Sequence, residues 1–427
     1  MRFFRPFDSR LALAIVLSLC APATWADDAG RALYHGYLAD APTARIAGVE
    51  RPGLSCAGCH GYNAAGGGEG RSRVPPIDGA TLASPTPGRP AYDAGTFRAA
   101  VSQGHASDGR TLSLAMPRFD LSPSQSDSLW EYLAHIAEED RGGVSADQIR
   151  IVVPAMTGNP ADAARLRDEL ERQWAARGIS TIHGRRVLFT VAPVESLASG
   201  DPARTAAFFL AIGPQLDDGG HVLDKLQRSG LPILGPRGHL PIKLPRTIVS
   251  VRASRDQVMD ALLRLASPTT TVVIDAPSRG ESTRPPGAIT PQDAMPPHSK
   301  RIVLAVGAAQ ARSFVRMNQQ NLKGRTVIAP LDTMSEDPDL IEDLLRQGTD
   351  VIAAKPAGDW SDPVAYASPL VAVLEAALVT VGRPLTRTRF LDAVASVHVQ
   401  CAGWPDLDYR RLPKNGTELV EFTRITR

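Results

Sequence analysis

The chain has 427 residues, with 47 basic and 45 acidic side chains and a formal net charge of +2. This length predicts more than one domain, because single hydrophobic cores rarely grow beyond about 250–300 residues. The near balance of charge lacks the strongly basic character of nucleic-acid-binding proteins, so we expect no nucleic-acid partner. Length and composition therefore predict a multidomain protein, and they identify no partner.

Residues 1–26 have the pattern of a signal peptide. Three arginines within the first ten residues precede an apolar run at residues 11–19, which is too short to span a membrane. Residues 24–26 provide a cleavage site, and we predict cleavage after Ala26. The pattern predicts export to the periplasm and no transmembrane span in the mature chain.

The most informative motif is Cys56-Ala57-Gly58-Cys59-His60. C-x-x-C-H is the attachment signature of a c-type haem, in which two thiols bond the porphyrin and the adjacent imidazole binds the iron. A redox dithiol would follow a strand in a βαβ unit, and a zinc site needs a second ligand pair, whereas the mature chain offers only Cys401 besides these two. The motif predicts one covalently attached haem c.

We expect Met116 to be the second axial ligand of the haem iron. It precedes Pro117 and lies downstream of the haem motif. A thioether is a common sixth ligand and raises the reduction potential. His105, in a loop, and His135, in an expected helix, are the alternatives. The glycine-rich residues 61–70 lack the flanking motifs of a phosphate-binding loop, and we expect them to let the backbone approach the haem closely.

A closing helix is predicted from residue 123. Ser122 and Gln125 form a capping box with proline at the first helical position. Leu129, Tyr132, Leu133 and Ile136 then recur at helical spacing, which indicates one buried face.

The order of helix, C-x-x-C-H, glycine-rich loop, Met-Pro and closing helix resembles a class I cytochrome c over residues 30–140. The resemblance implies an all-α cytochrome c domain at residues 27–142. It also implies thioether bonds at Cys56 and Cys59, with His60 and Met116 as axial ligands of the haem iron. The segment between Tyr34 and Cys56 is longer than is usual in that family.

From residue 148 the pattern changes to apolar strands alternating with amphipathic helices, which is typical of an α/β domain. Strands are predicted at residues 149–153, 186–191, 206–212, 232–234, 247–251, 271–274, 301–306, 326–329 and 350–354. Helices are predicted from Pro160 and at residues 255–266, 309–321, 336–347, 363–381 and 388–396. This pattern predicts two doubly wound lobes.

Residues 149–154, 231–236 and the run from 366 to the C-terminal tail resemble type I periplasmic binding proteins of the branched-chain amino-acid receptor family. The resemblance implies a binding-protein-like domain at residues 144–427. It nominates three strand ends for a small-molecule ligand, although ordinary turns explain them equally well. They are residues 155–158, 213–214 and 235–237. Six prolines between Asp275 and Lys300 predict that the second lobe is trimmed.

Together the motifs predict an exported monohaem c-type cytochrome that transfers single electrons in the periplasm. We expect redox partner proteins such as a dehydrogenase or a terminal oxidase, and a second domain that docks a partner or binds a ligand. We expect an electron carrier rather than an enzyme, with no catalytic residue set. The alternatives are a solute-binding receptor of an ABC-type uptake system with an accessory haem, and an enzyme at an open haem iron.

Overall fold

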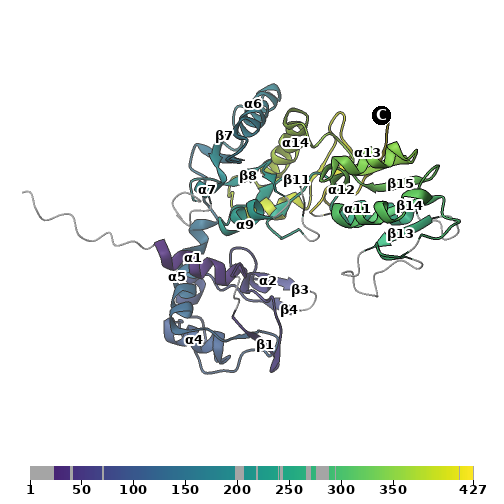
Figure 1. The fold of residues 1–427 in the computed structure, drawn as a ribbon. Helices are drawn as coiled ribbons and strands as arrows, with labels where there is room; N and C mark the ends of the chain where they lie inside the picture. The colour runs from purple at the N-terminus through teal and green to yellow at the C-terminus, as the bar shows by residue number, and fades with distance from the viewer. Residues whose placement is uncertain are drawn as a thin grey trace, which may run out of the picture. The chain divides into compact units, whose positions relative to one another are not determined.

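The computed structural model describes residues 24–38, 42–69, 72–197, 206–217, 220–238, 240, 244–265, 271–275, 288–293, 295–412 and 414–426. Most of the expected signal peptide, residues 1–23, lies outside them. The chain divides into two compact units, Met1–Ile136 and Ala137–Arg427, and Figure 1 shows their elements.

The first unit is mainly helical. Its helices are α1 (Thr24–His35), α2 (Cys56–His60), α3 (Gly79–Ala83), α4 (Ala94–Ser102) and α5 (Pro123–Glu139), whose last turn enters the second unit. Short antiparallel strands add to the expected helices: β1 (Ala44–Ile46), β2 (Val49–Glu50) and β5 (Arg118–Phe119) in one sheet, and β3 (Gly67–Glu69) with β4 (Ser72–Val74) in another. The described part of the long segment before the haem motif contains the β1–β2 hairpin.

Helices α1 and α5 pack at very short range. The predicted stripe on α5 is buried, since Leu129, Tyr132, Leu133 and Ile136 are each at most 2% exposed. A Cβ atom added to Gly30 of α1 would lie 2.2 Å from the carbonyl oxygen of Ser128. Glycine at this position therefore allows the two helix backbones to approach.

The predicted capping box at the start of α5 is confirmed. The Ser122 amide donates to Oε1 of Gln125 at 2.8 Å, and the Gln125 amide donates to Oγ of Ser122 at 3.2 Å. These two bonds satisfy amides that a helix start otherwise leaves without partners.

The first lobe of the second unit is a parallel five-stranded sheet in the order β12-β10-β8-β6-β7. Its strands are β6 (Gln148–Ala155), β7 (Arg186–Pro193), β8 (Leu210–Ile212), β10 (Ile233–Leu234) and β12 (Ile248–Val249). Its helices are α6 (Pro160–Ala176), α7 (Val194–Leu197), α9 (His221–Arg228), α14 (Pro363–Val381) and α15 (Arg387–Val394). A strand order that runs outward in both directions from β6 is that of a doubly wound sheet.

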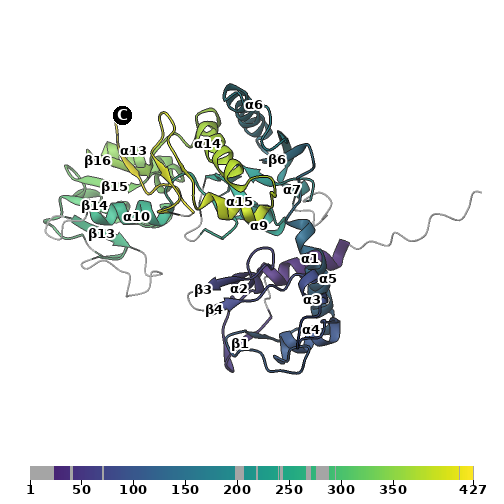
Figure 2. The ribbon, with the colours of Figure 1, turned by 180° about the vertical axis from the view of Figure 1, so that it is seen from behind.

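Helices cover both faces of this sheet, as Figure 2 shows from behind. Ile151 and Val153 of β6 belong to the core formed with α6, α14 and α15, whereas Val152 belongs to the core formed with α7 and α9. Successive strand residues point to opposite faces, so both faces of the continuous apolar run are buried.

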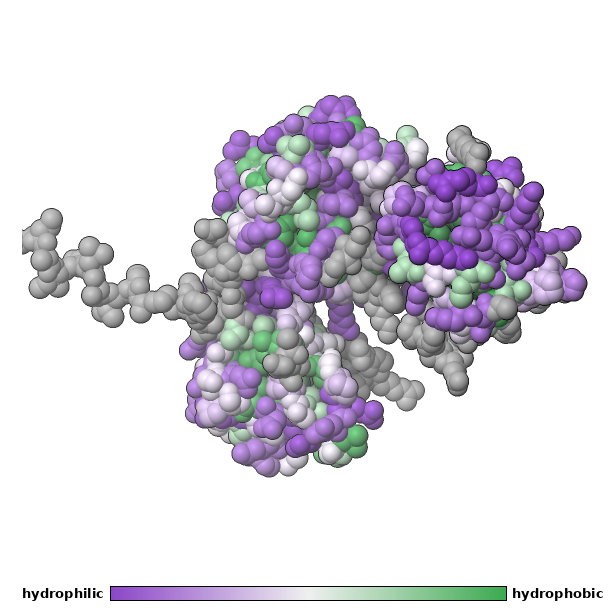
Figure 3. Space-filling view, viewed as in Figure 1, coloured by the Kyte–Doolittle hydropathy of each residue, from purple (hydrophilic) through white to green (hydrophobic). Residues whose placement is uncertain are grey.

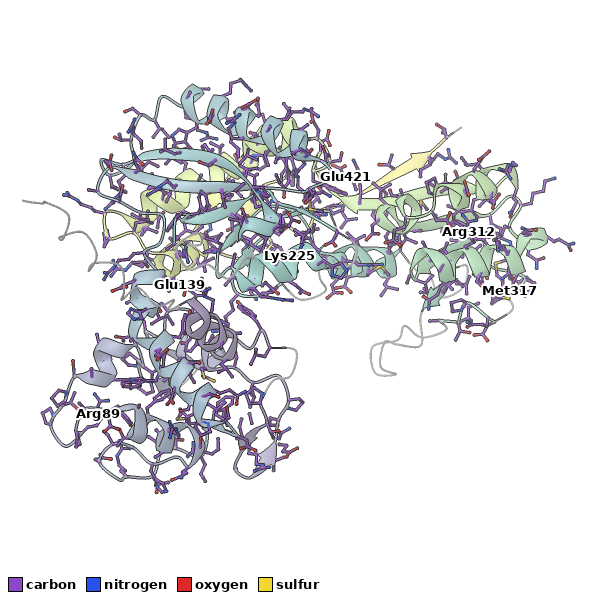
Figure 4. The ribbon with its side chains drawn as sticks, turned by 60° about the vertical axis from the view of Figure 1, so that its left-hand side comes forward. Arg89, Glu139, Lys225, Arg312, Met317 and Glu421 are labelled. Carbon is purple, nitrogen blue, oxygen red and sulfur yellow. The ribbon has the colours of Figure 1, made fainter. Side chains whose placement is uncertain are left out.

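The second lobe has the strand order β13-β14-β15-β16-β19. Strands β13 (Thr271–Asp275), β14 (Arg301–Ala305), β15 (Thr326–Pro330) and β16 (Asp350–Pro356) are parallel, and β19 (Val420–Ile425) pairs antiparallel with β16. Its helices are α10 (Arg255–Arg264), α11 (Ala308–Met317), α12 (Leu331–Ser335) and α13 (Pro338–Arg346). The face that Figure 3 shows over α11 and α13 is largely hydrophilic. Arg312 of α11, labelled in Figure 4, is partly buried and forms an ion pair with Asp337.

The predicted trimming of the second lobe concerns the segment between β13 and β14. Residues 276–287, which include Pro277, Pro285 and Pro286, lie outside the described residues. In the described remainder, Ile289 forms an isolated parallel bridge with Ile274 of β13.

The apolar helix α14 belongs to the core of the first lobe. It is long and apolar enough to cross a membrane by length and composition, and 56% of its apolar window is buried inside the structure. Tyr366, Leu370, Leu374 and Ala377 are each 0% exposed and pack with β6 and α6. Burial on this scale accounts for its apolar sequence.

The remaining elements are short: β9 (Gln215–Leu216) pairs with β11 (Arg237–Gly238), β17 (His398–Val399) pairs with β18 (Leu407–Asp408), and a 3₁₀ turn spans Gln319–Asn321. The end of α5 is fixed within the second unit, because the amide of Thr388 in α15 donates to Oδ1 of Asp140 at 2.8 Å. Glu139, labelled in Figure 4, lies 3.9 Å from the buried guanidinium of Arg387.

Candidate haem-attachment site

The motif Cys56–His60 folds as a single helical turn, α2. Ser55 caps its start by accepting a hydrogen bond from the Gly58 amide at 3.2 Å, and Gly61 ends it with a φ of 83°. Cys56 and Cys59 are three residues apart in this turn, so their thiols lie on the same face. The geometry therefore places two sulfur atoms on one side of the helical turn.

His60 is held in the form that binds a metal. Its Nδ1 atom lies 2.9 Å from the carbonyl oxygen of Pro75, so Nδ1 carries the hydrogen and donates to that oxygen. The residue is 8% exposed, and burial lowers the pKa of its imidazole. A neutral ring whose Nδ1 is used in this way leaves the Nε2 lone pair free for an iron atom.

The glycine-rich loop positions the Pro75 carbonyl. The Gly66 amide donates to the His60 carbonyl at 2.9 Å, and a Cβ atom at Gly66 would lie 2.5 Å from the Val74 oxygen. Gly66 also has a φ of 78°. Glycine is therefore favoured there both by this positive φ and by the lack of space for a Cβ atom. We expected small residues in this loop to approach the haem; at Gly66 the close approach that the structure describes is to the backbone of residues 74–76.

Tyr34 of α1 anchors the chain directly after the motif. Its hydroxyl donates to the Gly61 carbonyl at 2.7 Å, its side chain is 0% exposed, and burial raises its pKa. The neighbouring His35 lies 3.0 Å from the Tyr132 hydroxyl and stacks on Tyr37 at 5.3 Å between ring centroids. Burial, followed by the charge of Arg31, lowers the pKa of His35 to about 3.

Met116 lies in a loop of the same unit that is fixed by Arg118. The guanidinium of Arg118 donates to the Met116 carbonyl at 2.6 Å and to the Leu112 carbonyl at 3.1 Å. It fills the space beside Gly104, where a Cβ atom would lie 2.0 Å from Nε of Arg118. Met116 is half-buried, whereas the alternative ligands His105 and His135 are exposed.

The two thiols differ in their surroundings. Cys56 is half-buried and burial raises its pKa to about 12, whereas Cys59 is exposed. The structure brings Cys56, Cys59 and His60 together on one turn, and places Met116 on a separate loop before β5.

The donor set fits a c-type haem by its own chemistry: two thiols on one helical face, a neutral imidazole whose Nδ1 is already engaged, and a loop-borne thioether. Three supporting residues were not identified from the sequence. Tyr34, Pro75 and Arg118 act through contacts between segments that are distant in the chain or through backbone atoms, and a sequence pattern carries no signal for such contacts.

Residues 51–137 match the family model of cytochrome c. The predicted resemblance to that family is therefore confirmed for this segment, and the segment contains the motif and Met116. No curated protein matches the chain.

The chain is also similar to several solved structures. One is a type 1 periplasmic binding protein from Bordetella pertussis, at 14% identity, 66% coverage of this chain, 97% of that chain and a TM-score of 0.41. Another is an ABC transporter substrate-binding protein from Desulfitobacterium hafniense in complex with leucine, at 12% identity, 66% and 98% coverage and a TM-score of 0.43. A third is a fatty acid ABC transporter substrate-binding protein from Thermomonospora curvata, at 10% identity, 66% and 90% coverage and a TM-score of 0.42.

Proposed function

We propose that this protein is an exported monohaem c-type cytochrome that transfers single electrons between periplasmic partner proteins. The observation that carries the proposal is the helical turn Cys56–His60, with Nδ1 of His60 bonded to Pro75, inside a segment that matches the cytochrome c family. The proposed organisation is a signal peptide at residues 1–26, an all-α cytochrome c domain at 27–142 and a binding-protein-like domain at 144–427.

The proposed residue roles follow from the donor set. Cys56 and Cys59 hold one haem c by thioether bonds, and His60 and Met116 bind its iron. A c-type haem supplies one-electron chemistry at the iron. Pro75 fixes the His60 ring, Arg118 fixes the Met116 loop, and Tyr34 fixes the backbone that follows the motif.

The experiment is purification of the mature protein from a strain that assembles c-type cytochromes. We expect a coloured protein whose mass exceeds that of the cleaved chain by one haem. In Met116→Ala we expect a lower reduction potential and a reduced form that binds carbon monoxide, because the sixth position loses its ligand. A colourless protein would refute the proposal, and an unchanged potential in Met116→Ala would transfer the ligand role to His105 or His135. Carbon monoxide binding by the wild type would favour an enzyme at the haem.

We further propose that the α/β unit binds a small ligand or docks a redox partner. A cavity between its two lobes supports a ligand and favours the second candidate function, a solute-binding receptor of an uptake system with an accessory haem. Thermal unfolding of the full protein with amino acids and small organic acids tests this role. If no compound in such a set raises the melting temperature, partner docking remains the proposed role of this unit.

A further inference from the structure

A cavity of about 220 Å³ lies between the two lobes of the α/β unit. Gly238, Leu240 and Arg252 line it from the first lobe, and the elements α10, α12 and β16 line it from the second. Its volume is below the range of about 300–1,000 Å³ that is typical of sites for drug-sized molecules, so its ligand is small. None of the three strand ends nominated from the sequence lines this cavity.

Two of those strand ends, at residues 213–214 and 235–237, are instead occupied by packing and pairing within the first lobe. Cβ atoms at Gly213 and Gly235 would lie 2.3 Å and 2.0 Å from the side chains of Leu166 and Leu370, respectively. Arg237, which is 2% exposed, forms an ion pair with Asp162. The polar group available to a ligand is therefore elsewhere.

That group is Arg252, which lines the cavity and is only 4% exposed. Its Nε atom has no hydrogen-bond partner, and its Nη2 atom donates to the Gly238 carbonyl. Its guanidinium lies over the ring of Trp360, 4.5 Å from the centroid. Burial lowers its pKa, yet a guanidinium stays charged in proteins.

No described carboxylate forms an ion pair with Arg252. Asp332, which also lines the cavity, lies 3.7 Å from Arg255, and its negative charge also favours the charged form of Arg252 without forming an ion pair with it. A buried cation that has no anion in direct contact is stabilised when a bound ligand supplies one. The planar fork of an arginine matches a carboxylate, which could also accept from the unpartnered Nε atom.

The rest of the lining restricts the ligand further. The first turn of α10, from Arg255 to Val258, borders the cavity, and a helix N-terminus favours negative charge. Asp332 and Glu336 also border it and would repel a second negative charge. The remaining lining is largely apolar, and its members include Leu240, Val258, Leu331, Ala354, Pro356 and Trp360.

We propose that this cavity binds a small monocarboxylate, with Arg252 holding the carboxylate and Trp360 and its apolar neighbours holding the body of the molecule. The inference rests on the proposed ligand-binding role of the α/β unit and names the class of ligand. It is independent of the haem, whose residues lie in the other unit.

The test uses the full haem-loaded protein, with benzoate as the probe and its uncharged isostere benzamide as the matched compound. Calorimetry should show one benzoate site in the wild type, and benzamide should bind at least about tenfold more weakly because it lacks the charge. Arg252→Met keeps the length of the stem and should weaken benzoate binding at least about tenfold. Arg264→Met, at the exposed opposite end of α10, should leave it unchanged.

Arg252→Lys is the second variant if Arg252→Met does not fold, and it should also bind more weakly because lysine lacks the fork. Equal binding of benzoate and benzamide, or unchanged binding in the Arg252 variants, would overturn the carboxylate assignment while leaving ligand binding by the unit intact. Failure of benzoate and acetate to bind at up to about 10 mM, where even a millimolar site would be filled, would overturn the proposal. The haem spectrum should be the same for every variant and every added compound. The result of the binding test is therefore independent of the test of electron transfer.

Discussion

Replacing Gly30 by alanine should destabilise the first unit, although the same change normally stabilises a helix. Alanine is favoured over glycine in a helix interior by about 0.5–1 kcal/mol. At Gly30, however, the added methyl group would lie 2.2 Å from the Ser128 carbonyl oxygen and 2.6 Å from Cβ of Tyr132. Ordinary contact between such atoms requires about 3.5 Å, so α1 must move away from α5 by roughly 1 Å.

The size of the effect follows from these opposing contributions. Overpacking of a close contact costs about 1–3 kcal/mol, and the upper end applies because a backbone carbonyl in a helix cannot rotate away. Subtracting the gain in helix propensity leaves a net loss of about 2 kcal/mol, or roughly 10 °C in the melting temperature of a unit of this size.

The matched control is Gly95→Ala in α4, where the added methyl group comes no closer than 3.4 Å to Oδ1 of Asp93. This variant should be as stable as the wild type or slightly more stable. Unfolding of the full protein is followed in denaturant by the haem absorbance, and independently by hydrogen exchange of the α1 and α5 amides. If Gly30→Ala proves as stable as Gly95→Ala by both measurements, the close contact between α1 and α5 is not as described.

Three further outcomes are expected. Cys59→Ala should lose one thioether bond, seen as a shift in the absorbance of the pyridine-treated haem, whereas Cys401→Ala should leave that absorbance unchanged. Tyr34→Phe removes the 2.7 Å bond to Gly61 and should cost about 1 kcal/mol of unfolding free energy; an unaltered denaturation midpoint would contradict this. The pKa of His35 is depressed to about 3, so unfolding binds a proton below about pH 6.5 and the stability contributed by the neutral ring is lost as the pH falls from there. Lowering the pH from 7 to 5 should therefore cost about 2 kcal/mol more in the wild type than in His35→Phe, measured by denaturant unfolding at each pH.

Sequence patterns predicted the elements whose own residues carry a clear signal, such as an unbroken apolar run. Strands β6 and β14 to β16 are continuous apolar runs because both of their faces are buried, and such runs stand out from the surrounding chain. Strand β19 was missed because most of its residues are exposed, and only pairing with β16 makes it a strand. Its existence depends on residues about 70 positions earlier in the chain.

The haem motif was also predictable from local sequence, because all of its residues lie within one helical turn. The bond from His60 to Pro75 and the contact of Arg252 with Trp360 join residues 15 and 108 positions apart, and neither residue type alone indicates the other. Local patterns therefore nominated the residues that we propose hold the haem. They did not identify the residues that orient those groups, or the cavity in the second unit.

The route of the chain through the α/β unit determines when each part can become stable. Helix α14 closes the core of the first lobe, yet it is made only after strands β13 to β16 of the second lobe. Strand β19, at Val420–Ile425, completes the second lobe by pairing with β16. As the polypeptide emerges, neither lobe can reach its final form until these late elements have been made, whereas the segment bearing the haem motif is complete once residue 137 has been made. A nascent chain can thus fold its first unit while the second unit still exposes apolar strands, and loss of β19 would leave the edge of β16 open to association with other chains.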